Sequence, residues 1–225
     1  MYKKYIKRIL DIIFSLLGLI IASPIFLIVS LLVLIFLGYP IIFKQKRPGK
    51  DEKIFTLYKF RTMTNKKDKD GNLLPDEQRL TKFGKFLRKT SIDELPEFFN
   101  ILKGDMSFVG PRPMLIRDMV FFDKRIMKRQ CITPGLTGLA QISGRNSINW
   151  DQRFEYDLKY IDEISFSLDL KIIFLTFKTV IYHKGIGESG TDLSLDYGDY
   201  LLKCKRISKK LYDEKQQSAK QLLGG

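Results

Sequence analysis

The chain begins with a long apolar stretch that follows a basic start. Between Ile9 and Phe43 the only charged residue is Asp11. An apolar run of this length is typical of a segment that enters a membrane. Ile12–Phe43 has 32 residues, or roughly 48 Å as one straight helix, against a hydrocarbon core of about 30 Å. One straight helix across the bilayer therefore fits poorly.

Ser23-Pro24 interrupts this run near its middle. Proline removes a backbone hydrogen bond and clashes with the preceding turn, so we expect the helix to kink there. The Ser23 hydroxyl is a candidate partner for the freed carbonyls. Basic residues flank both ends of the run and prefer the cytoplasmic side. The pattern favours a re-entrant hairpin over a spanning helix, although both remain open, and Asp11 either pairs with Lys7 or Arg8 or is solvated.

Beyond the apolar run, the pattern predicts a small β-hairpin. Ile41–Gln45 and Ile54–Met63 are predicted strands around Arg47-Pro48-Gly49-Lys50, whose central Pro-Gly is typical of a type II turn. Asn65–Gln78 is polar and is predicted to be a mobile surface loop. Helices are predicted from Thr81 and over Asp118–Gln130, Trp150–Glu163 and Leu168–His183, with Gly- and Pro-rich loops at Gly104–Pro113 and Pro134–Asn146.

The expected fold is therefore α+β and mainly helical. Residues 1–43 would form a re-entrant, broken membrane helix with a basic flank. Residues 44–190 would form a compact cytosolic helical domain with the small β-hairpin, and residues 191–225 a basic tail that is helical or partly disordered. The sequence contains no GxxxxGK[ST], so this route to nucleotide binding is absent.

Charge adds a class of partner to this picture. The 225 residues include 39 Lys and Arg against 25 Asp and Glu, a net charge of +14. An excess of this size indicates a polyanionic partner, such as nucleic acid, anionic lipid headgroups or phosphorylated substrates. Cys131 and Cys204 cannot form a disulfide framework, which favours a reducing compartment. A single histidine, His183, argues against a His/Cys zinc site.

The densest group of chemically active side chains lies at Arg88–Pro96 and contains Asp93 and Glu94. Ser91 and Glu94 fit a capping box, but Pro96 suggests that the regular helix starts nearer to that proline. An Asp at a helix start beside Arg88 is expected to have a lowered pKa and to stay ionised. Such a carboxylate suits a nucleophile toward phosphorus or an Mg²⁺ ligand.

Two arginines are candidates for phosphate binding. Arg112 lies between two prolines, which restrict its backbone, and a guanidinium binds phosphate in a bidentate manner. Arg145 follows Gly144 and offers a second such contact. Asp157 either supports a metal or a ribose hydroxyl or is an exposed helical acid, and Trp150 is more typical of a core residue.

Several segments together resemble a known family. They are the basic start before Asp11, the Ser-Pro break, Lys59-Phe60-Arg61-Thr62-Met63, Ser91-Ile92-Asp93-Glu94-Leu95-Pro96, Leu102-Lys103-Gly104-Asp105-Met106-Ser107, Val109-Gly110-Pro111-Arg112-Pro113 and Pro134-Gly135-Leu136-Thr137-Gly138. In this order they are similar to the bacterial sugar transferases, the small monotopic phosphoglycosyl transferases. The resemblance covers roughly residues 1–190.

The resemblance implies transfer of a sugar 1-phosphate from a UDP-sugar to polyprenyl phosphate, usually undecaprenyl phosphate, with release of UMP. It implies a re-entrant helix with both ends cytoplasmic, at the bacterial inner membrane. The family's catalytic pair falls on Asp93 and Glu94, with Asp93 as nucleophile and Mg²⁺ required. Glu94 would help deprotonate the acceptor or hold the metal, and both roles remain open. By position, the phosphate or nucleotide contacts would be Arg88, Arg112 and Arg145, and more weakly Lys59 and Asp157.

A second hypothesis is a membrane-tethered basic adaptor that binds nucleic acid or anionic lipid. It would show salt-sensitive binding and would not use the acidic pair. Regular aromatic interleaving of the basic residues, as in single-strand binders, is absent, so we expect no nucleic-acid partner. A third possibility is a scaffold that has lost activity, which the intact Asp93, Glu94 and Arg112 disfavour. The sugar and the oligomeric state cannot be deduced from these residues.

Overall fold

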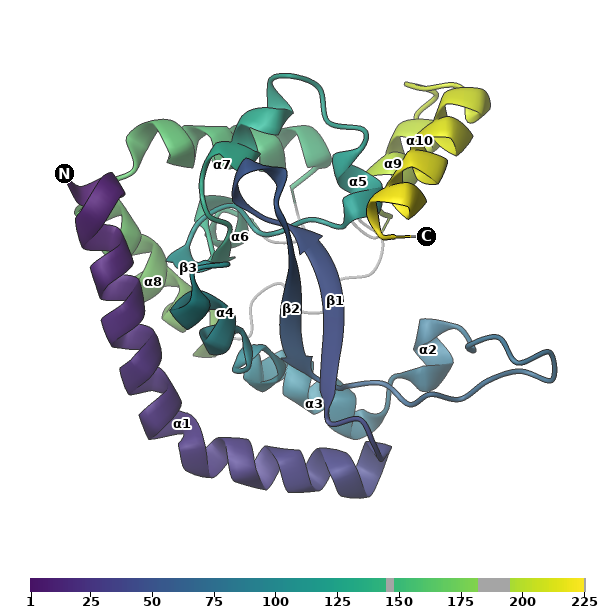
Figure 1. The fold of residues 1–225 in the computed structure, drawn as a ribbon, viewed down its shortest axis with the longest axis horizontal. Coiled ribbons are helices and arrows are strands. Elements are labelled where there is room, and N and C mark those ends of the chain that lie inside the picture. The colour runs from purple at the N-terminus through teal and green to yellow at the C-terminus, as the bar shows by residue number, and fades with distance from the viewer. Residues whose placement is uncertain (145–147, 182–194, 225) are drawn as a thin grey trace.

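The computed structural model describes residues 1–144, 148–181 and 195–224. Mainly helical α+β architecture is confirmed (Figure 1). The helices are α1 (Lys7–Leu37), α2 (Asp76–Arg79), α3 (Lys82–Thr90), α4 (Glu97–Lys103), α5 (Ile116–Met119), α6 (Leu139–Ile142), α7 (Trp150–Glu163), α8 (Phe166–Ile181), α9 (Tyr197–Lys203) and α10 (Lys209–Leu222). The strands are β1 (Ile42–Pro48), β2 (Ile54–Phe60), β3 (Ser107–Val109) and β4 (Gly135–Thr137).

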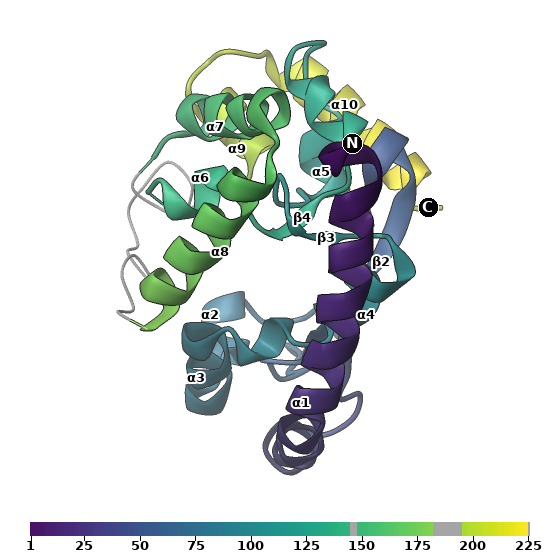
Figure 2. The same cartoon turned by 90° about the vertical axis from the view of Figure 1, so that its left-hand side faces the viewer.

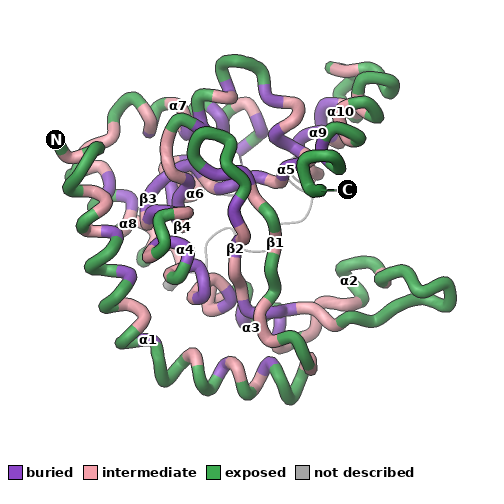
Figure 3. The backbone as a smooth tube through the Cα atoms, viewed as in Figure 1, coloured by how far each residue is buried: buried purple, intermediate pink, exposed green. Residues whose placement is uncertain are grey.

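Helix α1 contains the apolar run and is bent. Figure 1 shows it turning near its middle, so that its two arms follow two sides of the remaining chain. Pro24 lies inside the helix, and the Ser23 Oγ donates a hydrogen bond to the Ile20 carbonyl at 2.8 Å. Within the described ranges, the helical segment Tyr2–Leu37 is the one long and apolar enough to cross a membrane. Most of its surface is exposed (Figure 3).

Asp11 attaches the first arm of α1 to the rest of the chain. Its buried carboxylate accepts hydrogen bonds from the Ser107 Oγ at 3.1 Å and from the Phe108 backbone N–H at 3.0 Å. Pairing with Lys7 or Arg8 and a solvated helix end were therefore both wrong. A buried carboxylate needs donors, and the start of β3 supplies them.

Arginines bind both ends of α1 to the same body. Near the first end, Arg8 donates to the carbonyl oxygens of Ile101 and Leu102 in α4, at 2.6 and 2.8 Å. At the other end, the buried Arg61, just after β2, donates to the last carbonyls of the helix, including that of Leu37. These donors satisfy carbonyls that have no partner within a helix.

The predicted hairpin is confirmed, but its turn is different. Strands β1 and β2 are antiparallel, with Ile42 opposite Phe60 and Pro48 opposite Ile54. Pro48 thus belongs to the strand, where an edge position tolerates its missing N–H. The chain reverses over 49–53 instead, and the Gly49 N–H donates to the Lys53 carbonyl at 2.9 Å. The predicted type II turn was wrong.

The remaining elements partly follow the predictions. Helix α7 has the predicted bounds. The predicted polar loop is mostly exposed and contains a bridge between Lys67 and Leu73, but α2 begins within it at Asp76. Helix α8 runs over Phe166–Ile181, and His183 lies outside the described residues. The helix predicted over Asp118–Gln130 is wrong. The structure has α5 and a separate 3₁₀ turn, Ile126–Cys131. The two Gly-rich loops also pair, as β3 and β4 form a short parallel ladder.

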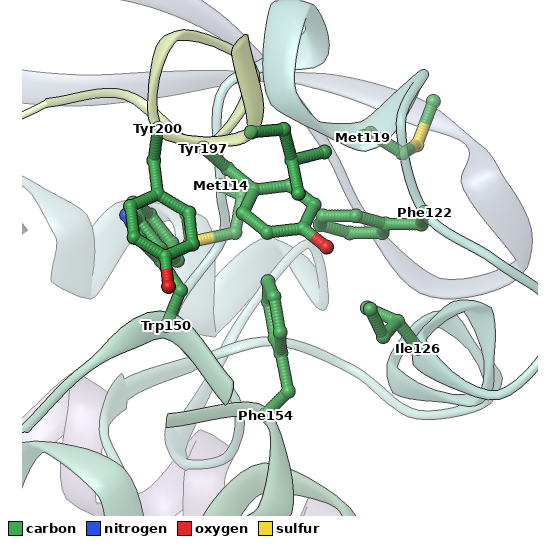
Figure 4. Close-up of a cluster of buried hydrophobic side chains, with 9 residues drawn as sticks. Met114, Met119, Phe122, Ile126, Trp150, Phe154, Tyr197 and Tyr200 are labelled. Atoms are coloured by element: carbon green, nitrogen blue, oxygen red, sulfur yellow. The ribbon is translucent and has the colours of Figure 1, made fainter. Parts of the chain in front are cut away.

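A large core lies between α5, α7 and α9 (Figures 2 and 4). Trp150 is buried there, as expected, and its ring centroid lies 5.3 Å from that of Tyr197 in α9. The Asp118 carboxylate accepts the Tyr197 N–H at 2.9 Å. Residues beyond Lys203 form α10, which contacts α5 through a hydrogen bond from Gln216 to the Arg117 carbonyl. The C-terminal helices are therefore packed on the domain.

Candidate active site

The acidic pair lies on a short 3₁₀ turn, Ile92–Glu94, between α3 and α4. Ser91 ends α3 in the left-handed region, at φ 57°, which turns the chain sharply before the acids. Its side chain forms no capping hydrogen bond, so the predicted capping box was wrong. The expectation that the regular helix begins near Pro96 is confirmed, because α4 starts at Glu97.

Glu94 is held by two cations from separate elements. Lys59 of β2 donates to its Oε1 at 2.6 Å, and Arg112 donates to the same atom at 2.9 Å. Burial raises the pKa of Glu94, but Arg112 and Lys59 outweigh it and hold the pKa well below its usual range. Glu94 is thus a fixed anion that positions both cations.

Glu97 is a third carboxylate of this group, and the sequence analysis missed it. Its Oε1 lies 3.1 Å from the Lys59 Nζ and forms no hydrogen bond among the described residues. Burial and the charge of Glu94 raise the pKa of Glu97 to about 7. Its position three residues after Glu94, with Pro96 between them at the start of a helix, was the available signal.

Asp93 differs from its neighbours because it has no polar partner among the described residues. Its side chain is buried and makes neither a hydrogen bond nor an ion pair with the part of the chain that the structure describes. Burial and the charge of Glu94 raise its pKa to about 6, despite Lys59, Arg88 and Arg112. The expectation of a lowered pKa was wrong because desolvation outweighs the nearby arginines. A buried, unpaired carboxylate of this kind is a candidate reactive group.

A cavity of about 560 Å³ opens beside this turn. Its charged lining includes Arg88, Glu94 and Arg112. The Arg88 Nε donates to the Thr62 Oγ1 at 3.0 Å, which fixes that arginine against the end of β2. The apolar lining comes from α4, α6, α8, the two short strands β3 and β4, and the turn before α4. It includes Leu95, Phe98, Phe108, Leu136, Ile142, Ile173, Phe177 and Val180. The cavity therefore combines cations suited to phosphate with an apolar wall.

Asp157 is placed behind the site, outside the described lining of the cavity. It is buried and accepts a hydrogen bond from the buried Arg129 Nε at 2.8 Å. Arg129 also donates to the Arg112 carbonyl at 2.9 Å. The alternative of an exposed helical acid was thus wrong, and in this position Asp157 supports Arg112 from behind. Arg145 lies outside the described residues.

The donor set fits a divalent cation only in a limited way. Among the described residues, no group of three or more His, Cys, Asp or Glu is arranged to hold a metal. Mg²⁺, however, usually takes one or two carboxylates and completes its shell with waters and substrate phosphates. The unpaired carboxylate of Asp93 beside a cation-lined cavity fits that mode.

Comparison with known proteins gives consistent matches. A family model described as bacterial sugar transferase matches residues 2–183. The uncharacterized sugar transferase EpsL of Bacillus subtilis (strain 168) is 49% identical over 184 residues, covering 82% of this chain and 91% of that protein. A UDP-glucose:undecaprenyl-phosphate glucose-1-phosphate transferase of Klebsiella pneumoniae is 47% identical, covering 76% of this chain and 39% of that protein. An undecaprenyl-phosphate galactose phosphotransferase of Salmonella typhimurium (strain LT2) is 37% identical, covering 81% and 42%.

Proposed function

The chain belongs to the bacterial sugar transferase family, and from this premise we propose that it transfers a sugar 1-phosphate from a UDP-sugar to undecaprenyl phosphate. UMP is released, and the lipid-linked sugar begins the assembly of a glycan at the membrane. The chain spans about two-fifths of the length of the Klebsiella and Salmonella relatives, so their complete activities enter here as part of the proposal. The supporting observation is the unpaired Asp93 beside the cation-held Glu94.

Asp93 is the proposed nucleophile. One carboxylate oxygen attacks the phosphorus that bears the sugar, and the bond from that phosphorus to the bridging oxygen of the diphosphate breaks. UMP leaves with the electron pair, and an aspartyl phosphosugar remains. A phosphate oxygen of the lipid acceptor then attacks the same phosphorus and releases the Asp93 carboxylate. With a pKa of about 6, Asp93 is mostly ionised at pH 7, and it is more basic than an ordinary Asp.

The cations stabilise the charge that develops on the transferred group and on UMP. Arg112 and Arg88 line the cavity, and Arg112 is fixed by Glu94 and by Arg129 behind it. Catalysis of phosphoryl transfer depends mainly on such positioning and charge stabilisation. We propose Mg²⁺ as the cofactor, held by Asp93 or Glu94, where it would neutralise charge on the donor diphosphate.

We further propose that α1 is re-entrant at the cytoplasmic face of the inner membrane. Four observations support this topology. The helix bends at its middle and exposes an apolar surface, and basic residues flank both ends. Arg8 and Arg61 bind the two ends to one body, α4 and the end of β2. A helix crossing the bilayer would instead place its ends on opposite faces, about 30 Å apart.

A mass measurement tests the reaction. Purified protein is incubated with a UDP-sugar and Mg²⁺, without acceptor, and the intact protein is weighed. We expect an adduct of one sugar phosphate that undecaprenyl phosphate removes. Asp93→Asn should form no adduct, whereas Asp162→Asn, an exposed change on α7, should behave as the wild type. An adduct on Asp93→Asn would refute the assignment of the nucleophile.

A further inference from the structure

Arg153 lies in the first turn of α7 and lines the same cavity as Glu94 and Arg112. Its guanidinium Cζ is 5.2 Å from the ring centroid of Trp150. Trp150 is itself buried in the core shown in Figure 4. The stacked ring therefore limits where the guanidinium can lie, at the wall of the cavity.

The guanidinium of Arg153 has no polar partner among the described residues. Of the arginines that the structure describes, it alone makes neither a hydrogen bond nor an ion pair with the described residues. By contrast, Arg112 has Glu94, and the nearby Arg129 has Asp157. The nitrogens of Arg153 are not among the fully buried polar atoms that lack a partner. They are thus reachable by a ligand.

The charge balance of the cavity favours an anion. The described charged residues that line it are Arg88, Arg112 and Arg153 against Glu94. Glu94 is already shared between Arg112 and Lys59, so it leaves Arg153 uncompensated.

Arg153 also bears a desolvation cost. Burial lowers its pKa to about 10, and repulsion from Arg129 and Arg112 adds to this despite the attraction of Asp157. The side chain is still charged at neutral pH. A half-buried cation without a counterion is costly, and an oxyanion in the cavity would offset that cost.

We propose that Arg153 is a further phosphate-binding residue of this cavity, contacting an oxyanion of the sugar nucleotide or of the lipid acceptor. The inference rests on the proposed function. A guanidinium presents two parallel N–H groups to phosphate, a geometry that lysine lacks. The phosphate of either substrate supplies the same chemistry, and kinetics separates the two sources.

The experiment uses full-length protein in detergent, with Arg153→Gln, Arg153→Lys and the control Arg125→Gln. Arg125 is exposed and pairs with Glu155. KM is measured for UDP-glucose and for undecaprenyl phosphate, kcat is measured for both, and UDP binding is measured by calorimetry. Because a hydrogen bond to a charged group contributes roughly 1.5–3 kcal/mol, Arg153→Gln should raise one KM by about tenfold or more. Arg153→Lys should fall between wild type and Arg153→Gln, and Arg125→Gln should match the wild type.

A higher KM for UDP-glucose with weaker UDP binding would assign the contact to the donor diphosphate. A higher KM for undecaprenyl phosphate alone would assign it to the acceptor. Unchanged values for both substrates in active Arg153→Gln would overturn the inference. If this variant does not fold, Arg153→Lys decides by the same criteria. Wild-type protein that neither binds UDP nor transfers any sugar phosphate would instead refute the proposed function.

Discussion

Arg129 donates a 2.9 Å hydrogen bond to the backbone carbonyl of Arg112. The first residue is buried, and the second reaches the carboxylate of Glu94 in the cavity. Asp157 holds Arg129 in turn, at 2.8 Å. A buried ion pair thus supports the guanidinium that faces the proposed substrate, although none of its atoms needs to contact the substrate.

Asp157→Asn should therefore act on stability. Removing one partner of a buried ion pair leaves the other charge uncompensated, and we expect a loss of about 3–5 kcal/mol in the free energy of unfolding. Denaturant unfolding in detergent measures this. Glu155, on the same helix as Asp157, forms an exposed pair with Arg125, and Glu155→Gln should cost about 0–1 kcal/mol. Equal losses in both variants would contradict the structural role of Asp157.

Asp93→Asn should stabilise the protein while it abolishes transfer. Burial and Glu94 disfavour the ionised form of Asp93, whose pKa rises from 3.8 to about 6. At pH 8 the amide removes this penalty, and we expect a gain of roughly 1–3 kcal/mol.

At low pH the difference in stability between wild type and Asp93→Asn should disappear, and it should not change sign. As the pH falls through 6 toward 4, wild-type Asp93 takes up a proton more readily when folded, so its stability approaches that of Asp93→Asn. Thermal unfolding at pH 8 and pH 4 tests this, with Asp162→Asn as control. A variant less stable than wild type at pH 8 would contradict the buried charge.

The rate of transfer should depend on the ionisation of the same group, Asp93. If Asp93 reacts as a carboxylate, kcat/KM should fall about tenfold per pH unit below about pH 6 and should level off above it. Glu97, with a pKa of about 7, is the competing explanation. Glu97→Gln should keep the acid limb near pH 6, and a shift of that limb would assign it to Glu97. Circular dichroism across the range excludes unfolding.

Metal removal should stop the reaction. Dialysis against EDTA is expected to abolish release of UMP, and added Mg²⁺ should restore it. Mn²⁺ serves as a probe for the Mg²⁺ site, and its binding is measured by electron paramagnetic resonance. Because Mg²⁺ usually binds through few carboxylates plus substrate phosphates, this binding should require UDP. Asp93→Asn should weaken it and Asp162→Asn should not. Full turnover in EDTA would exclude the metal proposal.

The topology proposal predicts that replacing Pro24, but not Ser23, changes the side of the membrane on which the N-terminus lies. The reporter is a cysteine in place of Lys3, in a chain whose exposed Cys131 and Cys204 are serines. It should react with an impermeant reagent only after the cells are opened. Pro24→Ala should restore a straight helix of 31 residues, roughly 46 Å long, which is enough to cross the bilayer.

In that variant the Lys3→Cys site should become reactive in intact cells. Ser23→Ala is the matched control, because it removes the hydroxyl contact to Ile20 but keeps the proline. Reactivity of Lys3→Cys in intact cells without the Pro24 change would indicate a spanning helix.

Local patterns predicted those elements whose stability is local. Helix α7 has an apolar face and a capping box formed by Asn149 and Gln152, and its predicted bounds match the structure. The helix predicted over Asp118–Gln130 failed because one distant contact and one local turn decide that segment. Asp118 turns inward to accept N–H groups of α9, and the Asp123 Oδ1 accepts the Ile126 N–H at 2.7 Å.

In the candidate site, too, some features were predictable from the sequence and others depend on tertiary packing. The acidic pair and Arg112 were apparent from residue types and spacing. The raised pKa of Asp93 was not, because burial is a property of the whole fold. Glu97 gained its role only when β2 brought Lys59 beside α4, at 3.1 Å. Sequence therefore indicated the candidate groups, while tertiary packing sets their protonation.

Polar contacts at both ends of α1 attach this helix to the part of the chain that lines the cavity. Asp11 is bonded to the start of β3, and Arg61 to the last turn of the helix. If α1 is embedded as proposed, these contacts couple the position of Asp93 to that of the helix. A thinner or thicker bilayer would then shift the carboxylate relative to the lipid headgroups. Lipid composition would then determine the distance between the acceptor phosphate and the Asp93 carboxylate.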